Sequence, residues 1–132
     1  MHLKDTIKNE RGQTMTEFAF VLPILLVVLF GIIQFGIIFN NYVALTDAAR
    51  AASRQGAVSR NAADPEGACE ATGYSAGANL DQPHVKFILT CDSSWAAGSD
   101  VTVTATYPYD IKLLDWVVAS GTLNTTMKER VE

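Results

Sequence analysis

The sequence predicts an α+β protein in which a long N-terminal α-helix precedes a small antiparallel β-sheet domain. The first observation is an apolar run of about 22 residues, 18–39, long enough for a membrane-spanning helix. The second is a set of short β-rich segments after residue 84, two of which alternate between β-branched or apolar and polar side chains. The third is a pair of cysteines in the last 70 or so residues, a length at which apolar burial alone is marginal and a disulfide is common.

The apolar run, residues 18–39, contains Gln34 as its only strongly polar side chain. A helix needs roughly 20 such residues to cross the hydrocarbon core, so we predict a transmembrane helix. A buried helix of a soluble protein is disfavoured because the rest of the chain is too small to cover it. A secretory signal peptide is also disfavoured, since its apolar core is about 7–15 residues and the Ala-Arg-Ala sequence at 49–51 lies too far downstream.

The charges on the two sides of the apolar run differ. Lys4, Lys8 and Arg11 precede it, whereas acidic residues outnumber basic ones about two to one from residue 60 onward. Basic residues beside a transmembrane helix tend to stay in the cytoplasm, so the N-terminus is expected inside and the C-terminal domain outside. The acidic outer part argues against nucleic-acid binding.

Gly12 ends the polar leader, and a lone carboxylate, Glu17, stands at the entrance of the apolar helix. A carboxylate near hydrocarbon is costly unless it is neutralised or paired, which suggests a partner for Glu17. Glu17 is equally consistent with an interfacial residue at a helix start, where the macrodipole favours negative charge. The residues alone leave both interpretations open.

The pattern Gly-x-x-x-x-Glu-Phe, followed at once by a long apolar helix, resembles the processing motif of type IV prepilins. The longer run from Arg11 to Val58 resembles the TadE-like proteins of tight-adherence (Tad, Flp-type) pilus systems. The small-residue segment AARAASRQGA and, more weakly, the ending LNTTMKERVE add to the likeness. The resemblance implies a type IV pilin-like fold, with a leader at 1–12, a helix at 13–58 and an extracytoplasmic domain at 59–132.

The resemblance also implies a set of partners and an assembly mechanism. A prepilin peptidase would cut between Gly12 and Gln13, and the new amine of Gln13 would then pair with Glu17 of a neighbouring subunit. Partners would be other pilin subunits of the same or another kind, the inner-membrane assembly platform and membrane lipids. Two departures are Phe18, where the Flp branch often has Tyr, and Gln34, where many TadE-like helices carry Glu.

Three residues of the apolar helix are candidate weak points. Pro23 lacks an N–H group, and Gly31 and Gly36 lower helix propensity. Membrane helices tolerate both residue types in general, so local extension on leaving the bilayer and plain tolerance remain equal alternatives.

Residues 40–58 continue the helix with an amphipathic pattern. One stripe is small or apolar, and we expect it to pack on the chain's own domain. Its members are Tyr42, Leu45, Ala49, Ala52 and Gly56.

In the outer domain, residues 61–83 are predicted to form a long loop with at most one short helical turn. Strands are predicted at 85–91, at 100–107, where Pro108 ends the run, and at 123–131, with a turn at 95–99. The apolar run at 111–118 fits a helix or a strand, and we favour a helix. A sheet of about three strands would then cover the emergent half of the long helix.

Cys69 and Cys91 face an oxidising compartment in this topology, so a disulfide is the default prediction. No Cys-x-x-Cys pattern, nucleophile signature or phosphate-binding loop suggests a metal, a cofactor or an enzyme. We interpret His84, beside Pro83, as a surface residue.

The predicted function is that of a TadE-like minor pilin or pseudopilin in the bacterial cytoplasmic membrane, delivered to a pilus at the cell surface and serving adhesion. One alternative is the major repeating subunit of a filament. The other is an uncleaved, membrane-anchored extracytoplasmic binding protein.

Overall fold

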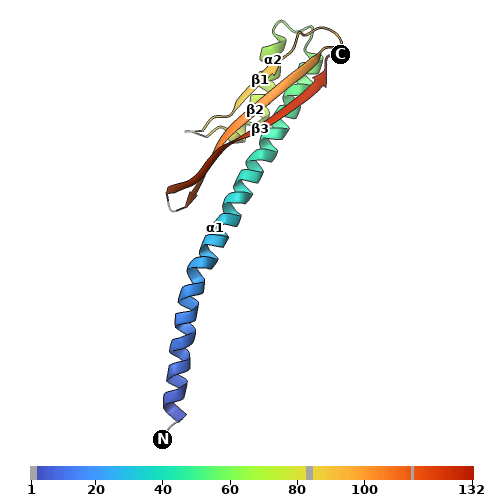
Figure 1. The fold of residues 1–132 in the computed structure, drawn as a ribbon. Helices are drawn as coiled ribbons and strands as arrows, with labels where there is room; N and C mark the ends of the chain where they lie inside the picture. The colour runs from blue at the N-terminus through green and yellow to red at the C-terminus, as the bar shows by residue number, and fades with distance from the viewer. Residues whose placement is uncertain (1–2, 83–84, 114) are drawn as a thin grey trace. The chain divides into compact units, whose positions relative to one another are not determined.

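A computed structural model describes residues 3–82, 85–113 and 115–132, with side chains described from residue 12 onward. Its elements in chain order are α1 (Leu3–Val58), α2 (Pro65–Ala76), the 3-10 turn η1 (Ala78–Leu80), β1 (Ile88–Asp92), β2 (Asp100–Leu113) and β3 (Trp116–Arg130), as Figure 1 shows. The chain divides into two compact units, Met1–Gly36 and Ile37–Glu132. A long apolar helix and a three-stranded antiparallel sheet confirm the predicted α+β class.

The sheet has the order β1-β2-β3, and both pairs of strands are antiparallel. β1 is short and pairs only with residues 102–106 of β2, whereas β3 pairs with β2 along its whole length, with one irregularity between Ile111 and Lys112. Beyond Tyr107, therefore, β2 and β3 continue as a two-stranded ribbon that β1 does not accompany.

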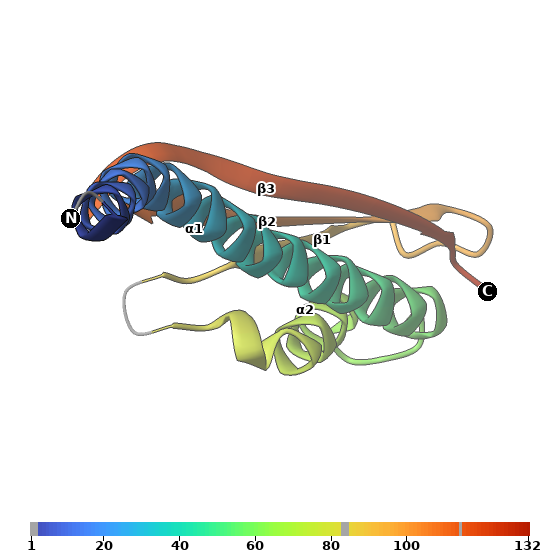
Figure 2. The same cartoon turned by 90° about the horizontal axis from the view of Figure 1, so that it is seen from below.

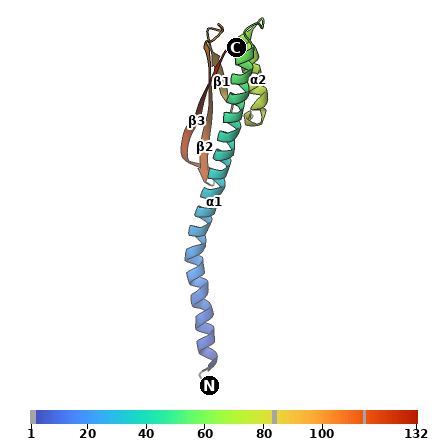
Figure 3. The ribbon, with the colours of Figure 1, turned by 90° about the vertical axis from the view of Figure 1, so that its right-hand side faces the viewer.

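The core of the second unit lies where the sheet, α2 and the C-terminal part of α1 meet. Figures 2 and 3 show this part of α1 between the sheet and α2. The predicted stripe is buried at Leu45, Ala49, Ala52 and Gly56, while Tyr42 remains 41% exposed. The prediction that the small residues of the long helix pack on the chain's own domain is thus confirmed, except at Tyr42. The residues completing the core are Ala48, Cys69, Leu80, Phe87, Leu89, Cys91, Val101, Val103, Ala105, Tyr107 and Val131.

The predicted loop at 61–83 was wrong for its central part, which forms α2 and η1. Asp64 caps α2 because its side chain accepts a hydrogen bond from the Gly67 N–H at 2.9 Å, and Pro65 occupies the first turn, where a missing N–H costs nothing. The glycines at 67 and 73 lower helix propensity, so the composition of this segment predicts a loop. The Asp-Pro-Glu sequence at 64–66 was the signal of a helix start.

The helix favoured at 111–118 was also wrong, as was the strand end predicted at Pro108. β2 runs through Pro108 to Leu113, and β3 begins at Trp116. Pro108 is tolerated because β2 is an edge strand on the side that β1 has left. Asp115 makes the turn with a positive φ of 67°, a conformation that Asp adopts more readily than most residues.

The other predicted strands extend as follows. The one predicted at 85–91 is β1, Ile88–Asp92, and the one predicted at 123–131 is the second half of β3. The turn predicted at 95–99 precedes β2 and contains Gly98, with a φ of 80°. His84 and Pro83 lie outside the described residues.

Candidate functional site

The predicted processing junction lies within α1. Gly12 has open space around the position that a Cβ would take, and the Thr16 hydroxyl donates to the Gly12 carbonyl oxygen at 2.9 Å. All side chains from Gln13 to Phe20 are exposed. Within the described residues of this unit, nothing covers Gly12 and Gln13, so a protein partner can reach them. Cleavage between these two residues stays a prediction.

Glu17 has a local partner that the sequence analysis did not anticipate. The Gln13 side-chain amide donates to Glu17 Oε1 at 3.3 Å across one helical turn. The i, i+4 spacing of an amide and a carboxylate was the available signal. A carboxylate accepts several hydrogen bonds, so this contact leaves acceptor capacity on Glu17 for a cation from another chain. The structure contains one chain, and the pairing between subunits stays a prediction.

After Glu17, α1 presents an apolar surface on all sides. Phe18, Phe20, Ile24, Ile32 and Phe35 are each more than 60% exposed. The segment Gly12–Val58 has a window of mean hydropathy 2.8 with none of it buried, and this helix is long and apolar enough to cross a membrane. Exposed apolar surface of this extent marks a membrane or interaction surface.

The candidate weak points do not interrupt α1. Pro23 lies inside the helix, and positions for a Cβ at Gly31 and Gly36 have no other atoms within 4 Å. These glycines therefore fill no packing role within the described chain. Local extension on leaving the bilayer stays a prediction, with plain tolerance of these residues as its equal alternative.

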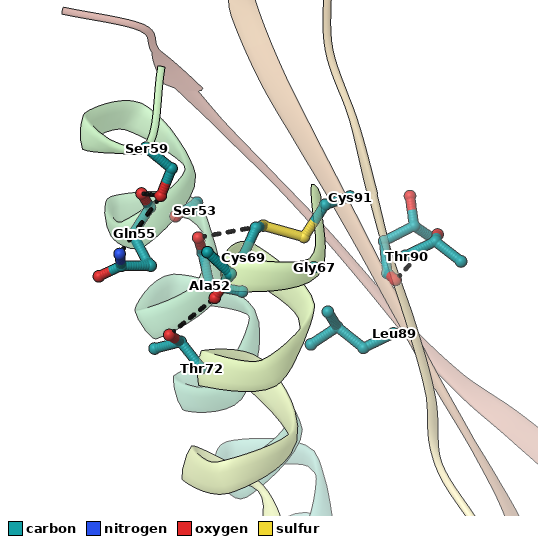
Figure 4. Close-up of a disulfide and its surroundings, with 12 residues drawn as sticks. Ala52, Ser53, Gln55, Ser59, Gly67, Cys69, Thr72, Leu89, Thr90 and Cys91 are labelled. Carbon is teal, nitrogen blue, oxygen red and sulfur yellow. Dashed lines mark hydrogen bonds between the residues drawn. A yellow bond between two sulfur atoms is a disulfide. The ribbon is translucent and has the colours of Figure 1, made fainter. Parts of the chain in front are cut away.

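A disulfide joins α2 to β1, as Figure 4 shows. The Cα atoms of Cys69 and Cys91 are 6.4 Å apart, and both residues are buried. Cys69 Sγ lies 3.3 Å from the Ala52 carbonyl oxygen of α1, a contact and not a hydrogen bond, because a disulfide sulfur carries no proton. The predicted bridge is thus present, and it ties α2 and the sheet at the point where both touch α1.

Small residues allow α1 and α2 to approach closely. A Cβ at Gly73 would overlap the Leu89 side chain and lie 3.0 Å from the Ala52 Cβ. A Cβ at Gly77 would lie 2.7 Å from Phe87 Cζ. A Cβ at Gly77 would also lie 3.1 Å from the Ala48 Cβ. Ala48 and Ala52 of the segment AARAASRQGA therefore pack closely against the two glycines.

Tyr74 links α2 to the edge strand β1. Its hydroxyl donates to the Leu89 carbonyl oxygen at 3.3 Å and accepts from the Leu89 N–H at 3.2 Å. Its ring also packs on Phe87, with centroids 5.0 Å apart. These two bonds occupy backbone groups that would otherwise make β1 an open sheet edge.

Within the described residues, no group of three or more His, Cys, Asp or Glu side chains is placed to hold a metal ion. The ion pair Arg50–Asp47, at 3.6 Å, is exposed and contributes little to stability. Burial raises the pKa of Tyr107, at the base of the β2–β3 ribbon.

The comparison with known families matches residues 12–54 to the family described as TadE-like protein. No curated protein and no solved structure matches the chain. The match begins at the glycine of the processing motif and ends within the small-residue segment of α1. TadE-like proteins are structural and associated with Tad pili, which points to a structural, pilus-associated component. Over residues 12–54 the resemblance inferred from the sequence is confirmed, and this segment is TadE-like.

Proposed function

We propose that the chain is a minor pilin or pseudopilin of a Tad-type pilus, cut by a prepilin peptidase after Gly12 and used in pilus assembly for adhesion. The observation that carries this proposal is the coincidence of three features in the TadE-like segment. They are a glycine with open surroundings, a carboxylate five residues later, and an exposed apolar helix starting directly after it.

The proposed assembly step is an ion pair between subunits. Cleavage converts the Gln13 backbone nitrogen into an amine, which approaches Glu17 of a neighbouring chain when the helices pack in parallel with an axial offset. The pairing offsets the cost of placing Glu17 beside apolar surface and fixes the register between helices. Cyclisation of an N-terminal Gln would remove the amine, and Glu17 would then have to be neutralised by protonation.

The second unit suits an extracytoplasmic location. A disulfide forms and persists in an oxidising compartment, and this unit contains one. Its acidic residues outnumber its basic ones. We propose a single pass with the basic N-terminus in the cytoplasm, membrane lipids and the assembly platform as first partners, and other pilin subunits as later ones.

Intact mass of the protein from envelope fractions tests the proposal. In cells with the peptidase the chain should begin at Gln13, and in cells without it the chain should keep residues 1–12. A chain that keeps Gly12 in peptidase-competent cells would instead indicate a permanently anchored binding protein. A filament consisting mostly of this chain would indicate the major subunit.

A further inference from the structure

The β2–β3 ribbon ends in an apolar surface that nothing else in the described chain covers. Trp116 is 82% exposed, and Val117 and Val118 are 54% and 66% exposed. Ile111 and Leu113 on the paired strand are only half-buried. Two-stranded hairpins are marginal in water, and apolar patches of this kind mark contact with a membrane or another protein.

The two strands of the ribbon are nevertheless paired along its whole length. Its pairing continues without a gap from Tyr107 opposite Leu123 to Ile111 opposite Ala119, and then to Leu113 opposite Trp116 after one irregularity. At its base the Tyr109 ring covers Gly121, where a Cβ would lie 2.7 Å from the tyrosine oxygen. The exposed tip is therefore held at a defined position in its unit.

The length of β3 shows how far the tip extends along α1 of the same unit. The far end of the sheet is fixed to α1 by the hydrogen bond from the Glu132 N–H to the Ala57 carbonyl oxygen, 3.1 Å long. From there back to Trp116 the strand spans roughly 50 Å at about 3.3 Å per residue. From Ala57 back to Phe39, where the apolar run ends, α1 spans only about 27 Å. Even a strand inclined by about 45° to the helix would cover roughly 35 Å along the helix axis.

Figures 1 and 3 agree that the hairpin end of β2 and β3 points away from the end of the sheet that carries the C-terminus. The tip thus reaches at least the level of Phe39 within its own unit. If residues 18–39 cross the membrane, as the proposed function requires, Phe39 lies at the outer membrane surface, and the tip lies within reach of that surface.

We propose that the Trp116–Val118 tip dips into the outer interface of the cytoplasmic membrane while the protein is membrane-bound. Tryptophan is enriched at this interface because its ring is apolar and its N–H can bond to headgroups or water. Asp115 lies in the turn that ends the ribbon, and Asp110 and Lys112 lie on β2 beside the apolar side chains. These charges limit the depth of the tip to the headgroup boundary. The tip and α1 would then give the domain two points of contact with the membrane, which fixes its orientation before assembly.

A pair of tryptophans makes the proposal testable in the full chain. Trp95 is partly buried against the core in the loop before β2. The same loop is held by the hydrogen bond from the Gly98 N–H to the Val131 carbonyl oxygen. β2, with 14 residues, is about 46 Å long, and the two tryptophans lie beyond its opposite ends. Trp95 is therefore the internal control for Trp116.

The full chain is reconstituted in vesicles of phosphatidylethanolamine and phosphatidylglycerol containing a phosphatidylcholine brominated near the headgroup end of its acyl chains. In the Trp95→Phe variant, Trp116 should lose most of its emission to the bromines. In the Trp116→Phe variant, Trp95 should keep nearly all of its emission. The difference in quenching between wild type and Trp116→Phe gives the same answer without altering Trp95.

Each outcome is decisive. Unquenched Trp116 in protein that floats with the vesicles overturns the tip proposal and leaves the membrane helix standing. Failure of the protein to float overturns both. A blue shift of Trp116 that appears only in pilus complexes, without quenching in vesicles, would assign the tip to a neighbouring subunit.

Discussion

Opening the Cys69–Cys91 bridge should destabilise the second unit, mainly because the unfolded chain gains conformational freedom. The bridge joins positions separated by 22 residues, and the chain-entropy model gives about 3 kcal/mol for closing a loop of this length. Both sulfurs are buried. Reduction removes the covalent link and also makes the two thiols move apart, so the entropy term is a lower estimate of the loss. The double variant Cys69→Ala/Cys91→Ala also removes buried volume and should lose roughly a further 1–2 kcal/mol.

The assay is thermal unfolding of the full chain in detergent, followed by near-ultraviolet circular dichroism of the sheet domain. For a unit of this size, 1 kcal/mol shifts Tm by roughly 4–8 °C, so reduced protein should melt roughly 12–25 °C lower than oxidised protein. The alanine double variant should melt lower still and should not respond to reductant. Equal Tm values for oxidised and reduced wild type would refute the argument that a unit this small depends on its disulfide.

Three other predictions concern the same unit. Gly73→Val should cost about 1–3 kcal/mol by overpacking against Leu89 and Ala52, whereas Gly31→Val, with open space around it, should leave the melting of the domain unchanged. Asp64→Ala should cost about 1 kcal/mol by removing the cap of α2, measured by the same melts. Burial raises the folded-state pKa of Tyr107, so the fold favours the neutral phenol. The free energy of unfolding should therefore be unaffected below a pH of about 10 and fall as the pH rises above it. Tyr107→Phe should weaken that fall, measured by the same melts at a series of pH values.

The sequence was sufficient where one physical requirement dominated. The length and hydropathy of residues 18–39 predict a long apolar helix, which α1 contains, and the small residues at 48–56 predict close packing, which the burial of Ala48, Ala49, Ala52 and Gly56 confirms. The Cys69–Cys91 bridge followed from the small size of the domain and from the expected oxidising compartment, and the sequence offers each cysteine no other cysteine as a partner.

The sequence misled where signals competed. In α2 the glycines at 67 and 73 lower helix propensity, but Gly73 is needed for contact with Leu89, so tertiary packing overrides propensity. In the ribbon, the short apolar run at 111–118 has no distinguishing period, and its strand form depends on a turn at Asp115 that composition does not reveal. The Gln13–Glu17 bond did not follow from the sequence, because a carboxylate at the entrance of an apolar helix can be satisfied as well by a group of another chain.

The most direct test of the proposed assembly mechanism compares Glu17→Gln with Asp47→Asn, a control that neutralises an exposed carboxylate of the same helix. Membrane level, fraction cleaved after Gly12, and recovery in sheared surface fibres or pilus complexes are measured for both variants and wild type. Loss of one partner of a buried pair costs about 3–5 kcal/mol at each subunit contact. Glu17→Gln should therefore insert and be cleaved normally but be lost from fibres and complexes, while Asp47→Asn should behave as wild type. Normal recovery of a fully cleaved Glu17→Gln protein would contradict the pairing of Glu17 with the Gln13 amine.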